Sequence, residues 1–144
     1  MDSSFYNIPR NGEGDGMKLK ILLLDDAERL CAILAERLAM EGYDVRTAND
    51  GRQGLTLYNN SPTDLVITDL LMPEVDGLEV IRTLRGLLAP PLIIAMSGGW
   101  SRDWDFLVEA TEFGANRTIS KPFALDELVI LVNDLLSSLS HQNV

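Results

Sequence analysis

The sequence has very little cysteine: Cys31 stands alone, so no internal disulfide can form. A chain without disulfides is typical of a reducing compartment. Cys31 lies in a segment whose apolar residues recur with helical spacing. We therefore predict a buried, unreactive thiol rather than a nucleophile.

Long apolar runs and basic clusters are also missing. No run approaches the roughly 18 apolar residues of a membrane-spanning helix, and the start of the chain lacks the basic and apolar regions of a signal peptide. These absences predict a cytoplasmic protein without a membrane segment. The 12 basic and 22 acidic residues give a net charge of −10, which argues against a nucleic-acid surface. The acid excess indicates either a solvated, self-repelling surface or an acidic site for a metal cation or a basic partner.

The 144 residues suit one domain and alternate between short apolar segments and segments of helical period. The segments 19–24, 64–69 and 91–97 are nearly continuous apolar runs, which is typical of parallel strands covered on both faces. Right-handed crossovers then favour an α/β fold, a (βα)5 doubly wound five-stranded parallel sheet. We expect strands at 19–24, 43–48, 64–69, 91–97 and 116–120, and helices at 27–41, 51–59, 76–87, 102–113 and 124–139.

The domain organisation follows from the same pattern. Residues 1–17 are polar, rich in glycine and asparagine and without period, so we predict a flexible leader. The domain covers 18–139, and 140–144 form a polar tail. The only histidine, His141, lies in that tail.

Charged and hydroxyl side chains follow four of the predicted strands. Asp25 and Asp26 end the first strand, Asp69 the third, Ser97 the fourth and Lys121 the fifth. Ligands of such sheets bind beyond the carboxyl ends of the strands, so these residues should converge on one rim. An aspartate at a strand–helix junction is often only a helix cap, and a single lysine is often only solvated.

Three acids are more than one helix cap requires. Two carboxylates about 5 Å apart repel by about 3 kcal/mol at an effective dielectric constant of about 20, and a third adds to this. A hard divalent cation with oxygen ligands, such as Mg²⁺, relieves the repulsion. An aspartate can also attack phosphorus to form an acyl phosphate, with cations and a hydroxyl binding the phosphoryl oxygens. Asp69 is the natural acceptor, and Lys121 and Ser97 are the natural partners of the transferred group.

Four motifs in register, "LLLDD", "VITDLLMPEVDGLEVI", "IIAMSG" and "ISKPF", resemble the receiver domain of two-component response regulators over residues 18–139. The resemblance implies the strand order 2-1-3-4-5. It also implies that Asp69 accepts phosphate from a sensor histidine kinase or a histidine phosphotransfer protein. Asp26 would ligate Mg²⁺ directly, Asp25 would position it, and the main-chain carbonyl of Leu71 would be a further ligand.

The resemblance assigns the remaining site residues as well. Lys121 would bind the phosphoryl group, and Ser97 would be the hydroxyl switch. The peptide bond before Pro122 would be cis, as is usual in the family. Such a domain assists its own phosphoryl transfer and dephosphorylation without being a conventional enzyme.

The sequence departs from the receiver pattern in three places. Thr118 stands where an aromatic residue is typical. Leu71 and Gly99 occupy the positions that tune the access of water to the phosphoryl group. The loop after the fourth strand carries Trp100 and Trp104, of which we expect at least one to be exposed and used by a partner. The "SGG…W" form resembles a subset of stand-alone, single-domain receivers.

Output would come through contact with a downstream protein or through a phosphorelay, without nucleic acid. A receiver-like scaffold that works without phosphorylation is the main alternative. An aspartyl-phosphate phosphatase of the haloacid-dehalogenase type is disfavoured, because Leu71 occupies the place of its second aspartate. An FMN-binding flavodoxin is disfavoured because the first loop reads "DDAE" instead of offering glycine and hydroxyl groups.

Overall fold

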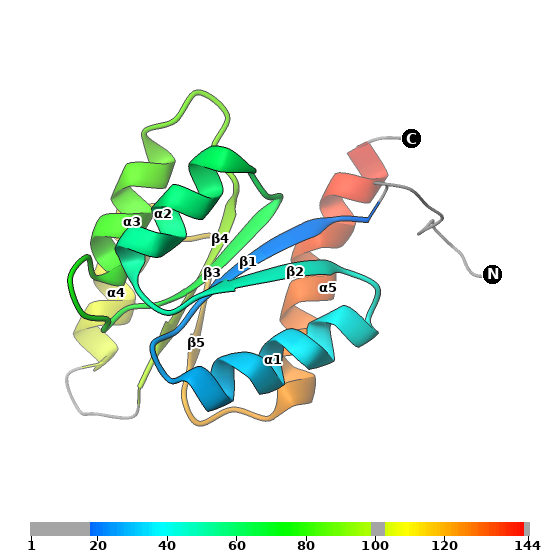
Figure 1. Cartoon of the computed structure of the whole chain (residues 1–144), viewed down its shortest axis with the longest axis horizontal. Coiled ribbons are helices and arrows are strands. Elements are labelled where there is room, and N and C mark those ends of the chain that lie inside the picture. The colour runs from blue at the N-terminus through cyan, green and yellow to red at the C-terminus, as the bar shows by residue number, and fades with distance from the viewer. Residues whose placement is uncertain (1–17, 99–102, 143–144) are drawn as a thin grey trace.

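The computed structural model describes residues 18–98 and 103–142, with side chains described over 18–98 and 107–139. Five strands alternate with five helices in this part of the chain (Figure 1). The elements are β1 (Lys20–Leu24), α1 (Glu28–Met40), β2 (Asp44–Ala48), α2 (Gly51–Asn60), β3 (Leu65–Asp69), α3 (Gly77–Arg85), β4 (Leu92–Ser97), α4 (Asp103–Phe113), β5 (Arg117–Ser120) and α5 (Leu125–Gln142).

The five strands form one parallel sheet in the order β2-β1-β3-β4-β5. The predicted fold class and strand order are therefore confirmed. The three central strands are almost wholly buried, while β2 and β5 at the edges are partly exposed, which explains why only the central segments are continuous apolar runs. The register pairs Leu24 with Thr68 and Asp69 with Met96, so β1, β3 and β4 end at the same edge.

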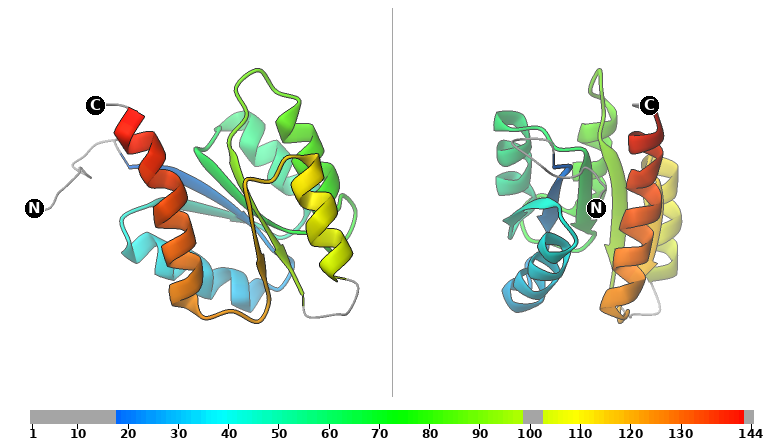
Figure 2. Two further views of the ribbon diagram at one scale, coloured as in Figure 1. Left: turned by 180° about the vertical axis from the view of Figure 1, so that it is seen from behind. Right: turned by 90° about the vertical axis from the view of Figure 1, so that its right-hand side faces the viewer.

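Helices cover both faces of the sheet and make two separate cores. Helices α1 and α5 pack on one face, and α2, α3 and α4 pack on the other (Figures 1 and 2). Cys31 lies in the first core and is 2 % exposed. Burial, together with the charge of Asp25, raises the pKa of this thiol to about 11. The predicted burial of the cysteine is confirmed, and its lack of reactivity stays a prediction.

Helix ends differ from the predicted ends by up to three residues. Asp76 caps α3 instead of joining it, because its side chain accepts a hydrogen bond from the Glu79 N–H at 2.9 Å. Gly42, the predicted stop of the first helix, has φ 102° and lies two residues beyond the last residue of α1. The predicted end of the last helix at residue 139 is too early: α5 continues to Gln142, because no glycine or proline interrupts it.

No helix in the described ranges is long and apolar enough to cross a membrane. The predicted leader, 1–17, lies outside the described residues, and so do Gly99, Trp100 and the side chains of Trp104 and His141.

Candidate functional site

The three predicted acids meet at the carboxyl edge of the sheet. Asp25 and Asp26 follow β1 directly, and Asp69 is the last residue of the neighbouring β3. One carboxylate oxygen from each lies within 4.8 Å of the others. Asp25 is fully buried, Asp69 is 7 % exposed, and Asp26 faces solvent. The cluster is thus open to a small ion through Asp26, while its other two members are held by the sheet.

Lys121 enters this cluster from the loop between β5 and α5. Its Nζ lies 2.8 Å from Asp25 Oδ2 and 3.2 Å from Asp69 Oδ2. Its main-chain N–H donates to the Ser97 carbonyl at 2.6 Å, and its peptide bond to Pro122 is cis, as the resemblance to receiver domains implies. Burial lowers the pKa of Lys121, but the hydrogen bonds and charges of the two acids outweigh burial and raise this pKa above its usual value. Lys121 is therefore a charged member of the site and not a solvated surface lysine.

Helix capping does not account for the aspartate pair. The N-cap of α1 is Ala27, which has no side-chain cap hydrogen bond. Asp25 Oδ1 accepts from the Ala27 N–H at 2.9 Å, while its Oδ2 binds Lys121. Asp25 thus shapes the loop and anchors the lysine, and Asp26 extends from the same loop as the exposed acid.

The carboxyl of Asp69 has a perturbed pKa. Burial is the main cause that raises this pKa from 3.8 to about 6; the charge of Asp25 adds to the rise, and Lys121 opposes it. A bare carboxylate is therefore unfavourable at this position, and a bound cation would favour the charged form. Perturbed titration in a rim of this kind is typical of a functional site.

Ser97 provides an unused hydroxyl at the end of β4. The residue is fully buried, and its Oγ is the one buried side-chain oxygen or nitrogen of the described residues that has no hydrogen-bond partner. Buried polar groups are nearly always paired, so this hydroxyl is available to a bound group. Its place at the same edge as Asp69 and Lys121 matches the predicted switch position.

The loop from β3 to α3 keeps the end of β3 close to the start of α3. A Cβ on Gly77 would lie 2.1 Å from the Asp69 carbonyl oxygen, so only glycine permits this approach. The Gly77 N–H donates to the Leu70 carbonyl at 2.9 Å, which closes the loop. Leu71, two residues after the acceptor, has an apolar side chain that is 47 % exposed at the rim.

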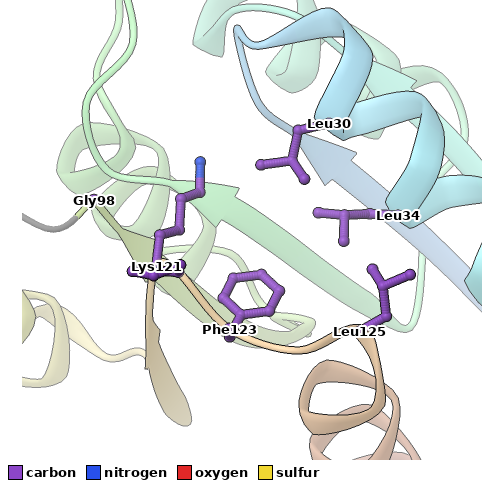
Figure 3. A pocket seen from close by; sticks show the side chains of 7 residues that line it. Leu30, Leu34, Gly98, Lys121, Phe123 and Leu125 are labelled. Carbon is purple, nitrogen blue, oxygen red and sulfur yellow. The ribbon is translucent and has the colours of Figure 1, made fainter.

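An apolar pocket of about 430 Å³ opens beside the acid cluster. In Figure 3, Leu30 and Leu34 project from α1 toward Phe123 and Leu125. The Lys121 side chain lies on the opposite side of the pocket from Leu30 and Leu34. Gly98 and Pro122 complete the lining. The sequence interpretation did not predict this pocket. Its walls come from α1 and from the segment before α5, about 90 residues later, and the apolar residues of each segment look like ordinary core residues.

The sequence interpretation also assigned no role in the site to Asn49. The sequence places it beside a helix cap, and Asp50 does cap α2 by accepting from the Gln53 N–H at 2.7 Å. Asn49 itself donates from Nδ2 to the Asp25 carbonyl at 3.1 Å. No sequence pattern signals this contact, since it joins two loops 24 residues apart.

A family model described as "Response regulator receiver domain" matches residues 21–133. The chain belongs to this family. A relative at 33 % identity over 138 residues is the transcriptional regulatory protein TrcR of Mycobacterium tuberculosis, with 93 % of this chain and 51 % of that protein covered. The transcriptional regulatory protein CpxR of Escherichia coli is 38 % identical over 117 residues, covering 81 % of this chain and 49 % of CpxR. The receiver chain thus spans about half the length of these curated relatives.

Solved receiver structures have the same architecture. The response regulator receiver domain protein from Clostridium thermocellum has a TM-score of 0.78 at 26 % identity and covers 86 % of this chain and 98 % of its own. The chemotaxis response regulator CheY4 of Vibrio cholerae has a TM-score of 0.75 at 26 % identity, with 83 % and 99 % covered. The receiver identity and the two-component class predicted from the four motifs are therefore confirmed.

The donor set of this receiver fits a hard divalent cation. Asp25, Asp26 and Asp69 supply only oxygen ligands and carry more negative charge than Lys121 balances. Mg²⁺ prefers such sites and keeps several waters when few carboxylates bind it. The acid cluster could therefore hold a metal ion of this class.

Proposed function

We propose that this receiver is a phosphorylation-dependent signalling switch in which Asp69 accepts a phosphoryl group from a phosphohistidine. The observation that carries the proposal is that Asp69 lies beside two further acids, with one oxygen of each within 4.8 Å of the others, and within hydrogen-bonding distance of Lys121. A nucleophilic carboxylate among cationic groups is what transfer to aspartate requires.

The chain's own residues perform the transfer as follows. A carboxylate oxygen of Asp69 attacks phosphorus, the bond from phosphorus to the donor imidazole nitrogen breaks, and its electron pair returns to that nitrogen. Lys121, 3.2 Å from Asp69 Oδ2, lies close enough to neutralise a phosphoryl oxygen. The buried Ser97 hydroxyl, which has no partner in the described part of the chain, would donate to another.

Mg²⁺ is the cofactor that we propose for this receiver. Asp25, Asp26, Asp69 and the main-chain carbonyl of Leu71 would hold it, with Asp26 as the direct ligand and Asp25 as the positioning acid. The bound ion supplies positive charge that offsets the carboxylates and the incoming phosphoryl oxygens. The raised pKa of Asp69 supports this assignment. The attacking carboxylate must be charged, burial disfavours that charge, and a bound cation would restore it.

The donor that we propose is a sensor histidine kinase or a histidine phosphotransfer protein. Its phosphohistidine must reach Asp69. The surface of the donor that surrounds the phosphohistidine would therefore lie against the edge of the sheet beside the apolar pocket between Leu30 and Phe123 (Figure 3). An apolar side chain of the donor would fill that pocket.

We propose output through a downstream protein or a phosphorelay. The net charge of −10 disfavours contact between the receiver itself and nucleic acid. Thr118, partly buried on β5, offers no aromatic ring as a switch, so the response would rely on Ser97 and the loop that follows it.

The experiment is incubation of the whole chain with acetyl phosphate and Mg²⁺, followed by intact mass. We expect a single added phosphoryl group that Asp69→Asn abolishes, because an amide cannot form the acyl phosphate. Asp76→Asn, an exposed acid on the same loop, is the matched control and should be labelled normally. Labelling of Asp69→Asn would disprove the acceptor assignment. An unlabelled wild-type chain would favour the scaffold that works without phosphorylation.

A further inference from the structure

The corner between β2 and α2, residues 48–52, contacts both the loop that carries Asp25 and Asp26 and the loop that follows Asp69, residues 70–76. We call it the β2–α2 corner. It lies outside the acid cluster, and none of its residues belongs to the three carboxylates that could hold a metal ion. The proposed mechanism assigns it no role.

Toward the first acid loop, the corner binds the main chain of Asp25 on both sides. The Asp25 N–H donates to the Ala48 carbonyl at 3.1 Å, and the Asp25 carbonyl accepts from Asn49 Nδ2 at 3.1 Å. The Asn49 main chain is fixed in turn, because its N–H donates to Gln53 Oε1 at 3.0 Å. Both polar main-chain groups of the buried acid are therefore held by the β2–α2 corner.

The corner also lies directly against the backbone of the loop that follows Asp69. A Cβ on Gly51 would lie 2.1 Å from the Val75 carbonyl oxygen and 2.9 Å from the Val75 carbonyl carbon. A real Cβ atom is essentially never found so close to a carbonyl group, so the loop can pack here only against glycine. Next to this contact, Arg52 Nε lies 3.5 Å from Glu74 Oε1, and Glu74 has φ 70°. The loop that follows the acceptor is thus held by α2.

We propose that Asn49 and Gly51 are positioning residues that set the spacing between the Asp25–Asp26 loop and the acceptor loop, and thereby the affinity for Mg²⁺. This inference rests on the proposed function. Mg²⁺ requires near-octahedral ligands at about 2.0–2.1 Å, so ligands from two separately encoded loops must be held in register. Partners that orient metal ligands typically change affinity by about 10- to 100-fold when they are removed.

Two variants separate this role from ordinary packing. Asn49→Ala removes the hydrogen bond to the Asp25 carbonyl, and Gly51→Ala forces the acceptor loop away. Gly54→Ala is the matched control: it lies on the same helix, but the three atoms nearest to its Cβ would all belong to the Leu24 side chain, the closest at 2.3 Å. Asn49→Gln retains the amide donor and serves as the conservative rescue.

Affinity for Mn²⁺ is measured from the electron paramagnetic resonance of the free ion, Mg²⁺ affinity by competition, and stability by thermal unfolding. We expect Asn49→Ala and Gly51→Ala to bind Mg²⁺ about tenfold more weakly, with Asn49→Gln closer to wild type. Gly54→Ala should lose stability and keep wild-type affinity. Labelling by acetyl phosphate should need more Mg²⁺ in the two variants but reach the wild-type plateau, which a folding defect would not allow.

The outcomes distinguish the inference from the proposed function. If the wild-type chain binds neither ion, the proposed function fails. If it binds them and both variants match it, only the positioning role fails. A loss of affinity in Gly54→Ala as large as in Gly51→Ala would also overturn the positioning role. Should Gly51→Ala fail to fold, the comparison of Asn49→Ala with Asn49→Gln decides.

Discussion

The ammonium of Lys121 lies 2.8 Å from Asp25 Oδ2. It lies 3.2 Å from Asp69 Oδ2, so the lysine binds the fully buried acid more closely than the acceptor. Lys121 therefore offsets the charge of a buried acid, and under the proposed function it would also bind the group transferred to Asp69.

Lys121→Met should lower stability when no metal ion is present. Breaking a buried ion pair by removing one partner costs about 3–5 kcal/mol, because the other charge remains uncompensated. Urea unfolding in a chelator should show this loss. Added Mg²⁺ should raise stability more in the variant than in wild type, since it replaces the missing positive charge. Lys18→Met, at an exposed lysine, should show neither effect.

Asp26→Ala should weaken Mg²⁺ binding by at least about tenfold while the fold remains intact. Asp26 faces solvent, and its carboxylate belongs to the acid cluster, so its removal deletes a ligand without opening the core. Glu28→Ala removes the same charge two residues away, at an exposed position in the first turn of α1. Calorimetric titration should distinguish the two. Equal Mg²⁺ affinities would place the metal away from Asp26.

The sequence was sufficient to predict the sheet and the meeting of Asp25, Asp26, Asp69 and Lys121 at one edge of it, and insufficient to predict the contacts between loops. Continuous apolar runs at 64–69 and 91–97 predict central strands because burial on both faces leaves no room for alternation. Strand ends then predict the rim that holds Asp25, Asp69 and Lys121. The bond from Asn49 to the Asp25 carbonyl depends on how two loops meet in space, and periodicity has no information about that.

Cys31 should be inert toward thiol reagents in the native protein. Burial raises the pKa of this thiol to about 11, so almost no thiolate is present at pH 8. A disulfide reagent such as dithionitrobenzoate should react with the sulfur only after denaturation. Because the folded pKa exceeds the unfolded one, the resulting stability is present in full below the unfolded pKa of about 9 and is lost as the pH rises toward 11. Rapid native-state reaction at pH 8 would contradict this burial.

Asp69→Asn should be more stable than wild type at pH 7.5 without metal. The folded pKa of Asp69, about 6, exceeds its ordinary value of 3.8, so the folded state binds the proton more tightly than the unfolded state. Its contribution to stability is therefore present in full below pH 3.8 and lost as the pH rises through about 6, a change on the order of 3 kcal/mol. Asparagine has no charge to desolvate.

Urea unfolding in a chelator over a series of pH values measures the effect of Asp69→Asn. The advantage of the variant should appear between about pH 4 and pH 6 and remain constant above it. Glu36→Gln, on the exposed side of α1, controls for the change in net charge. Added Mg²⁺ should then reduce the difference in stability between the variant and wild type. The ion binds the carboxylate of wild type more tightly than the amide of the variant, so it stabilises wild type more. A wild-type chain as stable as the variant at pH 7.5 would show that Lys121 already compensates the buried acceptor in full.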